Sequence, residues 1–111
     1  MAVDQLLKMG AIPLTNGSID LSKTPVLIVD IVDATITGNA HFSVVLSSSN
    51  AQQKIFYCDR NSSQMYIIQG YAVISNGTLT FSQFKRGQFN TATMTDCTAP
   101  TINAIYGIRA K

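Results

Sequence analysis

The sequence predicts an all-β fold, an antiparallel β-sandwich of jelly-roll type with seven or eight short strands. Three observations predict it. Glu, a strong helix former that strands tend to avoid, is absent from the 111 residues. Short β-branched and aromatic runs recur with turn signals at intervals of roughly ten residues, which is typical of sandwiches. The chain also leaves no room for the crossover helices that a parallel sheet requires.

The length predicts a single domain, residues 1–111, because division of a 12.0 kDa chain would leave neither part an adequate core. Residues 1–14 are set apart as an N-terminal helix or extended arm. Val3, Leu6 and Leu7 have helical spacing, and Gly10 could end a short helix. So short a helix is marginal on its own, so the extended alternative stays open.

The first half of the chain then predicts three strands separated by polar turns. The run Val26-Leu-Ile-Val-Asp-Ile-Val is apolar on both faces, which indicates a strand covered on both sides. The next strand, residues 41–47, alternates apolar and polar side chains. A third strand over residues 53–58 is followed by a turn rich in Asp, Asn and Ser at 59–63.

The second half contains the clearest local signal, a β-hairpin. Two runs, residues 65–74 and 78–82, flank Asn76-Gly77, which suits a type I′ turn because both central positions need positive φ. Gly70 in mid-strand predicts a bulge or a close approach of another group. The remaining expectations are a loop at residues 85–88, a strand at 91–97 and a final strand at 101–109.

Charge and apolar runs argue against nucleic-acid and membrane functions. The net charge of +2 comes from scattered cations, whereas binding to phosphates needs them clustered. No apolar run approaches the roughly 20 residues that span a bilayer. The N-terminus lacks the basic start and apolar run of a signal peptide, so we expect cytosolic synthesis with reduced thiols at Cys58 and Cys97. Both cysteines are expected in the core, and whether they pair stays open.

Catalytic and metal-binding arrangements find little support. His41 is the sole histidine, begins an alternating strand and has no nucleophile motif beside it, so a triad is not favoured. A zinc site needs about four ligands, and the chain has no such spacing. Asp30 and Asp33, three residues apart on a strand, should point to opposite faces, although a Ca²⁺ site from them and nearby carbonyls stays open. The sequence therefore predicts no enzyme, no cofactor and no metal site.

Tyrosines are the remaining candidates for a binding function. Tyr57, Tyr66 and Tyr71 all fall in predicted strands, and tyrosine is a good contact residue for sugars and proteins. The alternative for each is that it packs at the margin of the core.

Residues 55–111 carry a resemblance to a known group of proteins. The relevant segments are Ile55-Phe-Tyr-Cys-Asp-Arg, the hairpin from Met65 to Ser82 with its Asn-Gly-Thr turn, and the ending Ile102-Asn-Ala-Ile-Tyr-Gly-Ile-Arg. They resemble the terminal β-domains of tail, baseplate and receptor-binding proteins from phages and prophages of Gram-positive bacteria, siphophages above all. The resemblance covers about half of the chain, and the final octapeptide is its most specific part.

The resemblance implies a structural virion protein of the phage tail, made in the host cytoplasm. Its expected partners are other tail proteins or host cell-surface saccharide, with neither nucleic acid nor membrane insertion. Such domains are often trimeric, and a monomer stays open. Because no fibrous or coiled-coil segment precedes the sandwich, an accessory or adaptor role is favoured over an adhesin. The alternative function is a free-standing carbohydrate-binding module.

Overall fold

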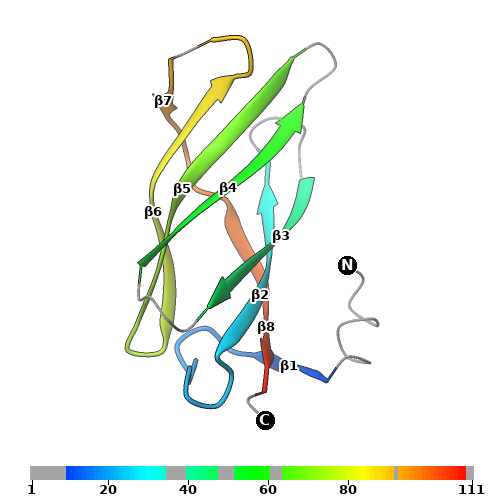
Figure 1. Cartoon of the computed structure of the whole chain (residues 1–111), viewed down its shortest axis with the longest axis vertical. Coiled ribbons are helices and arrows are strands. Elements are labelled where there is room, and N and C mark those ends of the chain that lie inside the picture. Colours follow the sequence, from blue (N-terminus) through cyan, green and yellow to red (C-terminus); the bar gives the residue numbers. More distant parts are fainter. Residues whose placement is uncertain (1–9, 35–39, 48–51, 61–63, 92, 110–111) are drawn as a thin grey trace.

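Two four-stranded antiparallel sheets make up the described part of the chain, which in this computed structural model comprises residues 10–34, 40–47, 52–60, 64–91 and 93–109 (Figure 1). Sheet A has the order β1–β8–β2–β3, and sheet B has the order β4–β5–β6–β7. The strands are β1 (Ala11–Leu14), β2 (Val26–Asp33), β3 (Ala40–Ser47), β4 (Gln52–Arg60), β5 (Met65–Ser75), β6 (Thr78–Gln88), β7 (Thr95–Asp96) and β8 (Thr101–Ile108).

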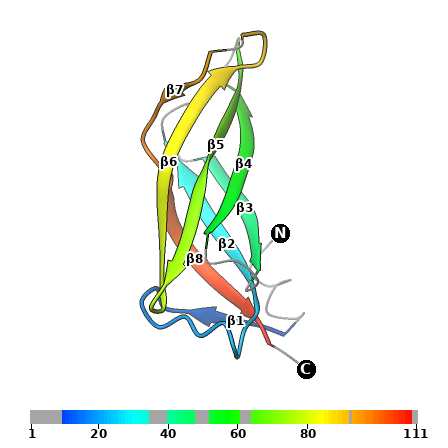
Figure 2. The same ribbon diagram turned by 60° about the vertical axis from the view of Figure 1, so that its left-hand side comes forward.

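The predicted all-β sandwich is confirmed, with a topology of its own. Sheet B is a meander in which β4, β5, β6 and β7 follow one another, whereas a jelly roll is built from two Greek keys. Sheet A combines the β2–β3 hairpin with strands from the two ends of the chain. The two sheets face one another along the length of the molecule (Figure 2).

The core lies between the sheets because side chains alternate along each strand. In β2, Leu27, Val29 and Ile31 point inward and are fully buried. Ile28 points the other way and joins a smaller cluster around Tyr106 on the outer side of sheet A. Apolar packing on both faces of this strand is therefore confirmed. Sheet B contributes Ile55, Tyr57, Ile68, Ala72, Ile74, Leu79 and Phe84 to the same main core.

The last strand, β8, lies inside sheet A. The predicted final strand is confirmed as β8, which pairs with β1 on one side and β2 on the other. A Cβ atom at Gly107 would lie 2.6 Å from the Cβ of buried Thr24, so glycine is needed for this close approach. Residues 11–14, which the sequence assigned to an arm, form β1; residues 1–9 of that prediction lie outside the described residues.

The β5–β6 hairpin has the predicted turn and the predicted bulge. Asn76 and Gly77 have φ angles of 52° and 79°, as a type I′ turn requires. Opposite Gly70 the register shifts by one residue, and Gln83 on β6 takes a φ of 56°. The ring of Phe84 occupies the space where a Cβ atom of Gly70 would stand.

Four local predictions were wrong in whole or in part. Residues 85–88 continue β6 instead of forming a loop, and among the described residues of the predicted strand at 91–97 only Thr95–Asp96 form a strand. Cys58 is exposed, because the inward positions of β4 are taken by Ile55 and Tyr57. Cys97 is half-buried against the core, and both thiols are free. Of the turn predicted at 59–63, Asp59 and Arg60 instead belong to β4, and residues 61–63 lie outside the described residues.

Candidate functional site

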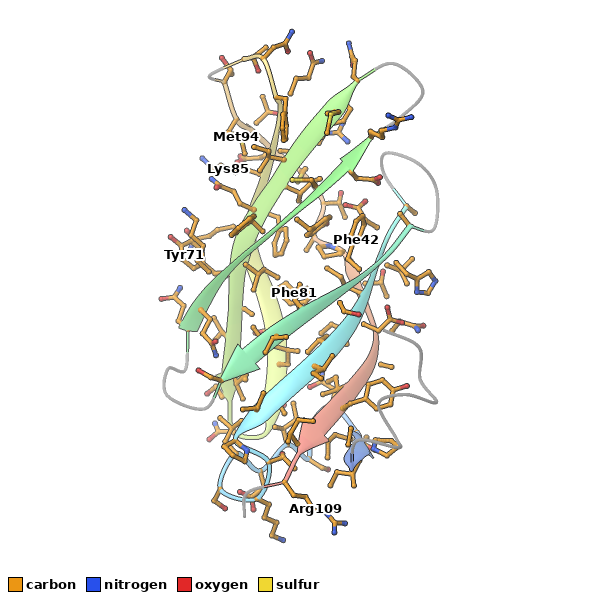
Figure 3. The ribbon with its side chains drawn as sticks, turned by 45° about the vertical axis from the view of Figure 1, so that its right-hand side comes forward. Phe42, Tyr71, Phe81, Lys85, Met94 and Arg109 are labelled. Carbon is orange, nitrogen blue, oxygen red and sulfur yellow. The ribbon has the colours of Figure 1, made fainter. Side chains whose placement is uncertain are left out.

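The outer face of sheet B combines aromatic, amide and basic side chains in two adjacent rows. The strand register places Lys54, Tyr71 and Ser82 side by side in the first row. The second row consists of Phe56, Gln69 and Lys85. Because neighbouring strands lie about 4.8 Å apart, each row forms a continuous strip across three strands. In Figure 3 Tyr71, Lys85 and Met94 lie on the same side of the sheet, while Phe42 and Phe81 lie between the sheets. We call the six residues of the two rows the sheet B platform: Lys54, Tyr71, Ser82, Phe56, Gln69 and Lys85.

Phe56 is the least typical residue of the sheet B platform. Its side chain is 70% exposed, more than any other large apolar side chain in the described residues. Together with Val45 of β3, which is 66% exposed, it flanks an open hollow of about 250 Å³ between the edge strands β3 and β4. Exposed apolar groups that gather at one place often mark contact surfaces. The sequence missed Phe56, because the run Ile-Phe-Tyr-Cys does not reveal which residues face outward.

Tyr71 is the only one of the three candidate tyrosines that lies on the sheet B platform. It is half-buried in the middle of β5, opposite Lys54. Its ring thus stands beside a cation and one row from the amide of Gln69, a set of groups that can stack on and hydrogen-bond to a polar partner.

Tyr66 lines a separate hollow at the far end of sheet B. Its hydroxyl donates a hydrogen bond to Gln64 Oε1 at 2.7 Å, and the guanidinium carbon of Arg86 lies 5.7 Å from the ring centroid. Gln88 Nε2 donates to the same Gln64 oxygen at 3.1 Å. The hollow measures about 380 Å³ and is completed by Gly87 and by the threonines Thr91, Thr93 and Thr95. These are hydrogen-bonding groups, so the hollow suits a polar ligand.

Tyr57 belongs to the core. Its side chain is buried, its ring lies 4.6 Å from that of Phe42, and its hydroxyl donates a hydrogen bond of 2.6 Å to Asp33 Oδ2. Burial, followed by the hydrogen bond to the Asp33 carboxylate, raises the pKa of Tyr57 well above its ordinary value. This tyrosine therefore anchors a buried carboxylate and does not face a partner, so it is removed from the candidates for surface binding.

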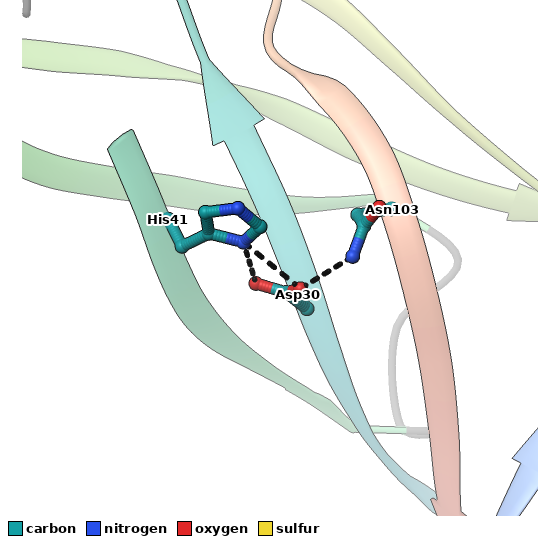
Figure 4. Close-up of polar contacts among 3 residues, drawn as sticks. All are labelled: Asp30, His41 and Asn103. Carbon is teal, nitrogen blue, oxygen red and sulfur yellow. Dashed lines mark hydrogen bonds and ion pairs between the residues drawn. The ribbon is translucent and has the colours of Figure 1, made fainter. Parts of the chain in front are cut away.

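Asp30, His41 and Asn103 form a polar group on the outer face of sheet A (Figure 4). His41 Nδ1 lies 3.2 Å from Asp30 Oδ2, and Asn103 Nδ2 donates to the same oxygen at 2.7 Å. Asp33 points into the core, so the two aspartates lie on opposite faces as predicted. The imidazole is oriented by Asp30, but within the described chain no hydroxyl or thiol lies within hydrogen-bond distance of it. The group links the three strands β3, β2 and β8 on the surface of sheet A.

The described chain contains no group of three or more His, Cys, Asp or Glu side chains that could hold a metal ion. No helix in it is long and apolar enough to cross a membrane. Comparison with protein-family models, with curated proteins and with solved structures gave no match.

Proposed function

We propose that the protein is a non-enzymatic structural component of a bacteriophage tail or baseplate. In this role it contacts other tail proteins or saccharide on the host cell surface. The proposal draws its phage context from the resemblance of residues 55–111, whose most specific part, the final octapeptide, runs along β8 and past its end. It includes synthesis in the host cytoplasm and incorporation into the virion tail.

The observation that carries the binding role is the sheet B platform. Its two rows present an exposed Phe56 and a half-buried Tyr71 between Lys54 and Lys85, on a surface of amides and hydroxyls. An aromatic surface with few charges and many hydrogen-bonding groups is typical of contact sites for proteins and sugars. By contrast, His41 contacts only Asp30 among the described hydrogen-bond partners, and Asp30 in turn accepts a hydrogen bond from Asn103 of β8 on the outer face of sheet A.

Mass spectrometry of virions, purified from the bacterial strain that carries the gene, tests the phage assignment. We expect the chain in the tail fraction at a fixed ratio to other tail proteins. A strain in which Tyr71→Ala replaces the wild type should yield tails with less of the protein, while Thr80→Ala, on the same face two residues from Ser82, should be incorporated normally. Virions that contain none of the protein would contradict the assignment.

A free-standing carbohydrate-binding module is the second candidate function. The specific observation in its favour is the close grouping of Tyr71, Gln69 and Lys54, which offers a stacking ring, an amide and a cation on one flat face. The test is a glycan array followed by calorimetry at millimolar sugar. Binding that falls about tenfold in Tyr71→Ala and is unchanged in Thr80→Ala would favour this function. An array without any binding would remove it.

A further inference from the structure

The four edge strands of the sandwich are not equally protected against pairing with another chain. At two edges the strands are short: β1 has four residues and contains Pro13, and β7 has two. Short strands and proline are the usual means by which native proteins block edge pairing. The other two edges are long, because β3 has eight residues and β4 has nine, and neither contains proline.

Of the two long edges, β3 is partly closed by its neighbour. The Gln53 side chain accepts a hydrogen bond from Ser47 N–H at 3.0 Å and donates one to Ser47 C=O at 2.6 Å. Both main-chain groups of the last residue of β3 are therefore occupied. The β4 edge is the longest edge in the described chain, and it carries the exposed Phe56 at its centre.

We propose that β4 pairs in antiparallel fashion with β4 of a second copy of this chain, around a two-fold axis at Phe56. The two sheets B then join into one eight-stranded sheet. Phe56 is the fifth of the nine residues Gln52–Arg60, so this is the register that pairs the whole strand. Two-fold dimers with self-complementary surfaces are the commonest kind of homo-oligomer.

The side chains on the outer face suit this register. Phe56 lies opposite Phe56 of the second copy, and aromatic pairs of this kind are favourable beyond the area they bury. Lys54 falls opposite Cys58, and Gln52 falls opposite Arg60, so no charge faces a like charge. The nearest like-charge pair is the diagonal from Lys54 to Arg60, roughly 7–8 Å apart and close to the screening length in physiological salt.

Shifted registers are less favourable. Centring the pair on Lys54 places two ammonium groups directly opposite one another, which is destabilising in a sheet. Centring it on Cys58 places Phe56 opposite Arg60 and leaves the first residues of β4 without a partner strand. Centring it on Tyr57 places Lys54 opposite Arg60, and centring it on Ile55 places Phe56 opposite Lys54 and not opposite a second aromatic ring. A slip of one strand by a single residue would pair the outer face of one copy with the inner face of the other. The register centred on Phe56 is thus the one that pairs all nine residues of β4 and packs Phe56 against itself.

The dimer would double the sheet B platform. A two-fold axis perpendicular to the sheet keeps both outer faces on the same side, so the two Tyr71 rings would lie on one continuous surface. This inference goes beyond the proposed function and does not depend on it. It requires only the β4 edge, whereas the tests of the proposed function rest on Tyr71 in the next strand.

Sedimentation equilibrium and light scattering over a range of concentrations give the first test. We expect a monomer–dimer equilibrium that weakens at least about tenfold in Phe56→Asp, since the variant replaces an apolar contact by two carboxylates on the axis. Thr80→Asp, on the same face but two strands from the edge, is the matched control and should dimerise as the wild type does. Circular dichroism checks that both variants are folded. A monomer at all concentrations, a trimer, or a dimer unaffected by Phe56→Asp would overturn the proposal.

A disulfide trap tests the register itself. In a Cys97→Ser background, Lys54→Cys places a thiol opposite the native Cys58 of the other copy, at the 4.5–5.5 Å Cα separation typical of antiparallel pairs and suited to a disulfide. With oxidised glutathione we expect a covalent dimer, reduced in yield when Phe56→Asp is added. Thr80→Cys in the same background also carries two thiols and should form no disulfide-linked dimer. Equal cross-linking of both variants, or none in Lys54→Cys, would overturn the register.

Discussion

Tyr57 and Asp33 form a polar pair inside an otherwise apolar core. Asp33 is 2% exposed and Tyr57 is 7% exposed, and their hydrogen bond joins β2 of sheet A to β4 of sheet B. A buried carboxylate is costly unless it accepts hydrogen bonds, and the phenol supplies one of its donors. The ring also stacks on Phe42 of β3. One side chain thus connects both sheets through apolar and polar contacts.

The first prediction follows from this pair. Tyr57→Phe keeps the ring and its packing but removes one donor to the Asp33 carboxylate, so we expect a loss of about 1–3 kcal/mol in the free energy of unfolding. Urea titration followed by circular dichroism measures it. Tyr71→Phe, which removes a hydroxyl from the outer face of sheet B, should change the free energy by less than about 0.5 kcal/mol. Equal losses in the two variants would contradict the role assigned to the buried pair.

The second prediction concerns pH. The pKa of Tyr57 is raised in the folded protein by burial and by the Asp33 carboxylate, whereas an unfolded tyrosine titrates near pH 10. The resulting stabilisation is complete below about pH 10 and is lost as the pH rises further, because only the unfolded state then releases the proton. The free-energy difference between wild type and Tyr57→Phe should therefore shrink between about pH 9 and pH 11. A difference that stays constant in urea titrations over this range would contradict the shift.

At the scale of elements, the Asn16-Gly17 turn after β1 is hydrogen-bonded to the Asn76-Gly77 turn of the β5–β6 hairpin. Gly17 N and Ile19 N both donate hydrogen bonds to Gly77 O, at 2.9 and 3.0 Å. The Asn16 side chain accepts from Leu79 N at 2.8 Å and donates to Leu79 O at 3.0 Å, which imitates the pairing of a further strand. The segment after β1 is thereby fixed to the β5–β6 hairpin.

The third prediction tests this connection. Asn16→Ala removes two partly buried side-chain hydrogen bonds to the main chain of Leu79, so we expect a loss of about 1–2 kcal/mol in the free energy of unfolding. Amide exchange at Gly17 and Ile19 should accelerate more than exchange in β8. Asn90→Ala, at an exposed turn residue, is the control and should have almost no effect. Unchanged exchange at Gly17 in Asn16→Ala would show that the turn is held by other contacts.

The fourth prediction concerns β8, one of the two central strands of sheet A. Its removal, by truncation before Ile102, leaves β1 without its partner strand and uncovers one edge of β2. It also removes buried Ile105 and Tyr106. We expect a chain without a cooperative thermal transition. A truncated protein that melts cooperatively would mean that the remaining strands form a core without β8.

The elements that could be predicted from the sequence are those specified by local signals. The type I′ hairpin needs positive φ at two adjacent residues, and Asn76-Gly77 supplies them. A glycine in mid-strand, Gly70, predicted the bulge. The structure gives the reason for the glycine, since a Cβ atom there would collide with the Phe84 ring. By contrast, the sequence did not predict the extension of β6 through Lys85 and Arg86, because the alternation of apolar and polar residues ceases there.

What the sequence could not reveal depends on pairing between distant residues. The pairing of Ala11 with Ile108 joins the two ends of the chain, and no local pattern encodes it. The same holds for the sheet B platform: Lys54, Tyr71 and Ser82 become neighbours only through the register of three strands. The burial of Tyr57 could not be predicted for a related reason. Tyr57 shares a face of β4 with Ile55, and the sequence does not show whether that face or the face of Phe56 enters the core.

At the scale of the whole molecule, the two sheets differ in how the chain builds them. Sheet B is formed by one continuous segment, residues 52–96, whereas sheet A combines strands from the beginning and the end of the chain. A single apolar cluster nevertheless receives side chains from both, including Leu27 and Ile31 from β2 and Ile68 and Leu79 from β5 and β6. Each sheet therefore covers the inner, apolar face of the other sheet.

The fifth prediction is that the domain unfolds in one step despite this split. Urea unfolding followed by tyrosine fluorescence, which reports on all four tyrosines, including the buried Tyr57 and Tyr106, should coincide with unfolding followed by far-ultraviolet circular dichroism, which reports on all strands. The excised segment 52–96 should remain unfolded, because its inner face would lose the cover of sheet A. A segment 52–96 with a cooperative transition, or two separate midpoints in the whole chain, would show that sheet B holds together without the shared core. The single core is what makes the platform on one sheet depend on strands from both ends of the chain.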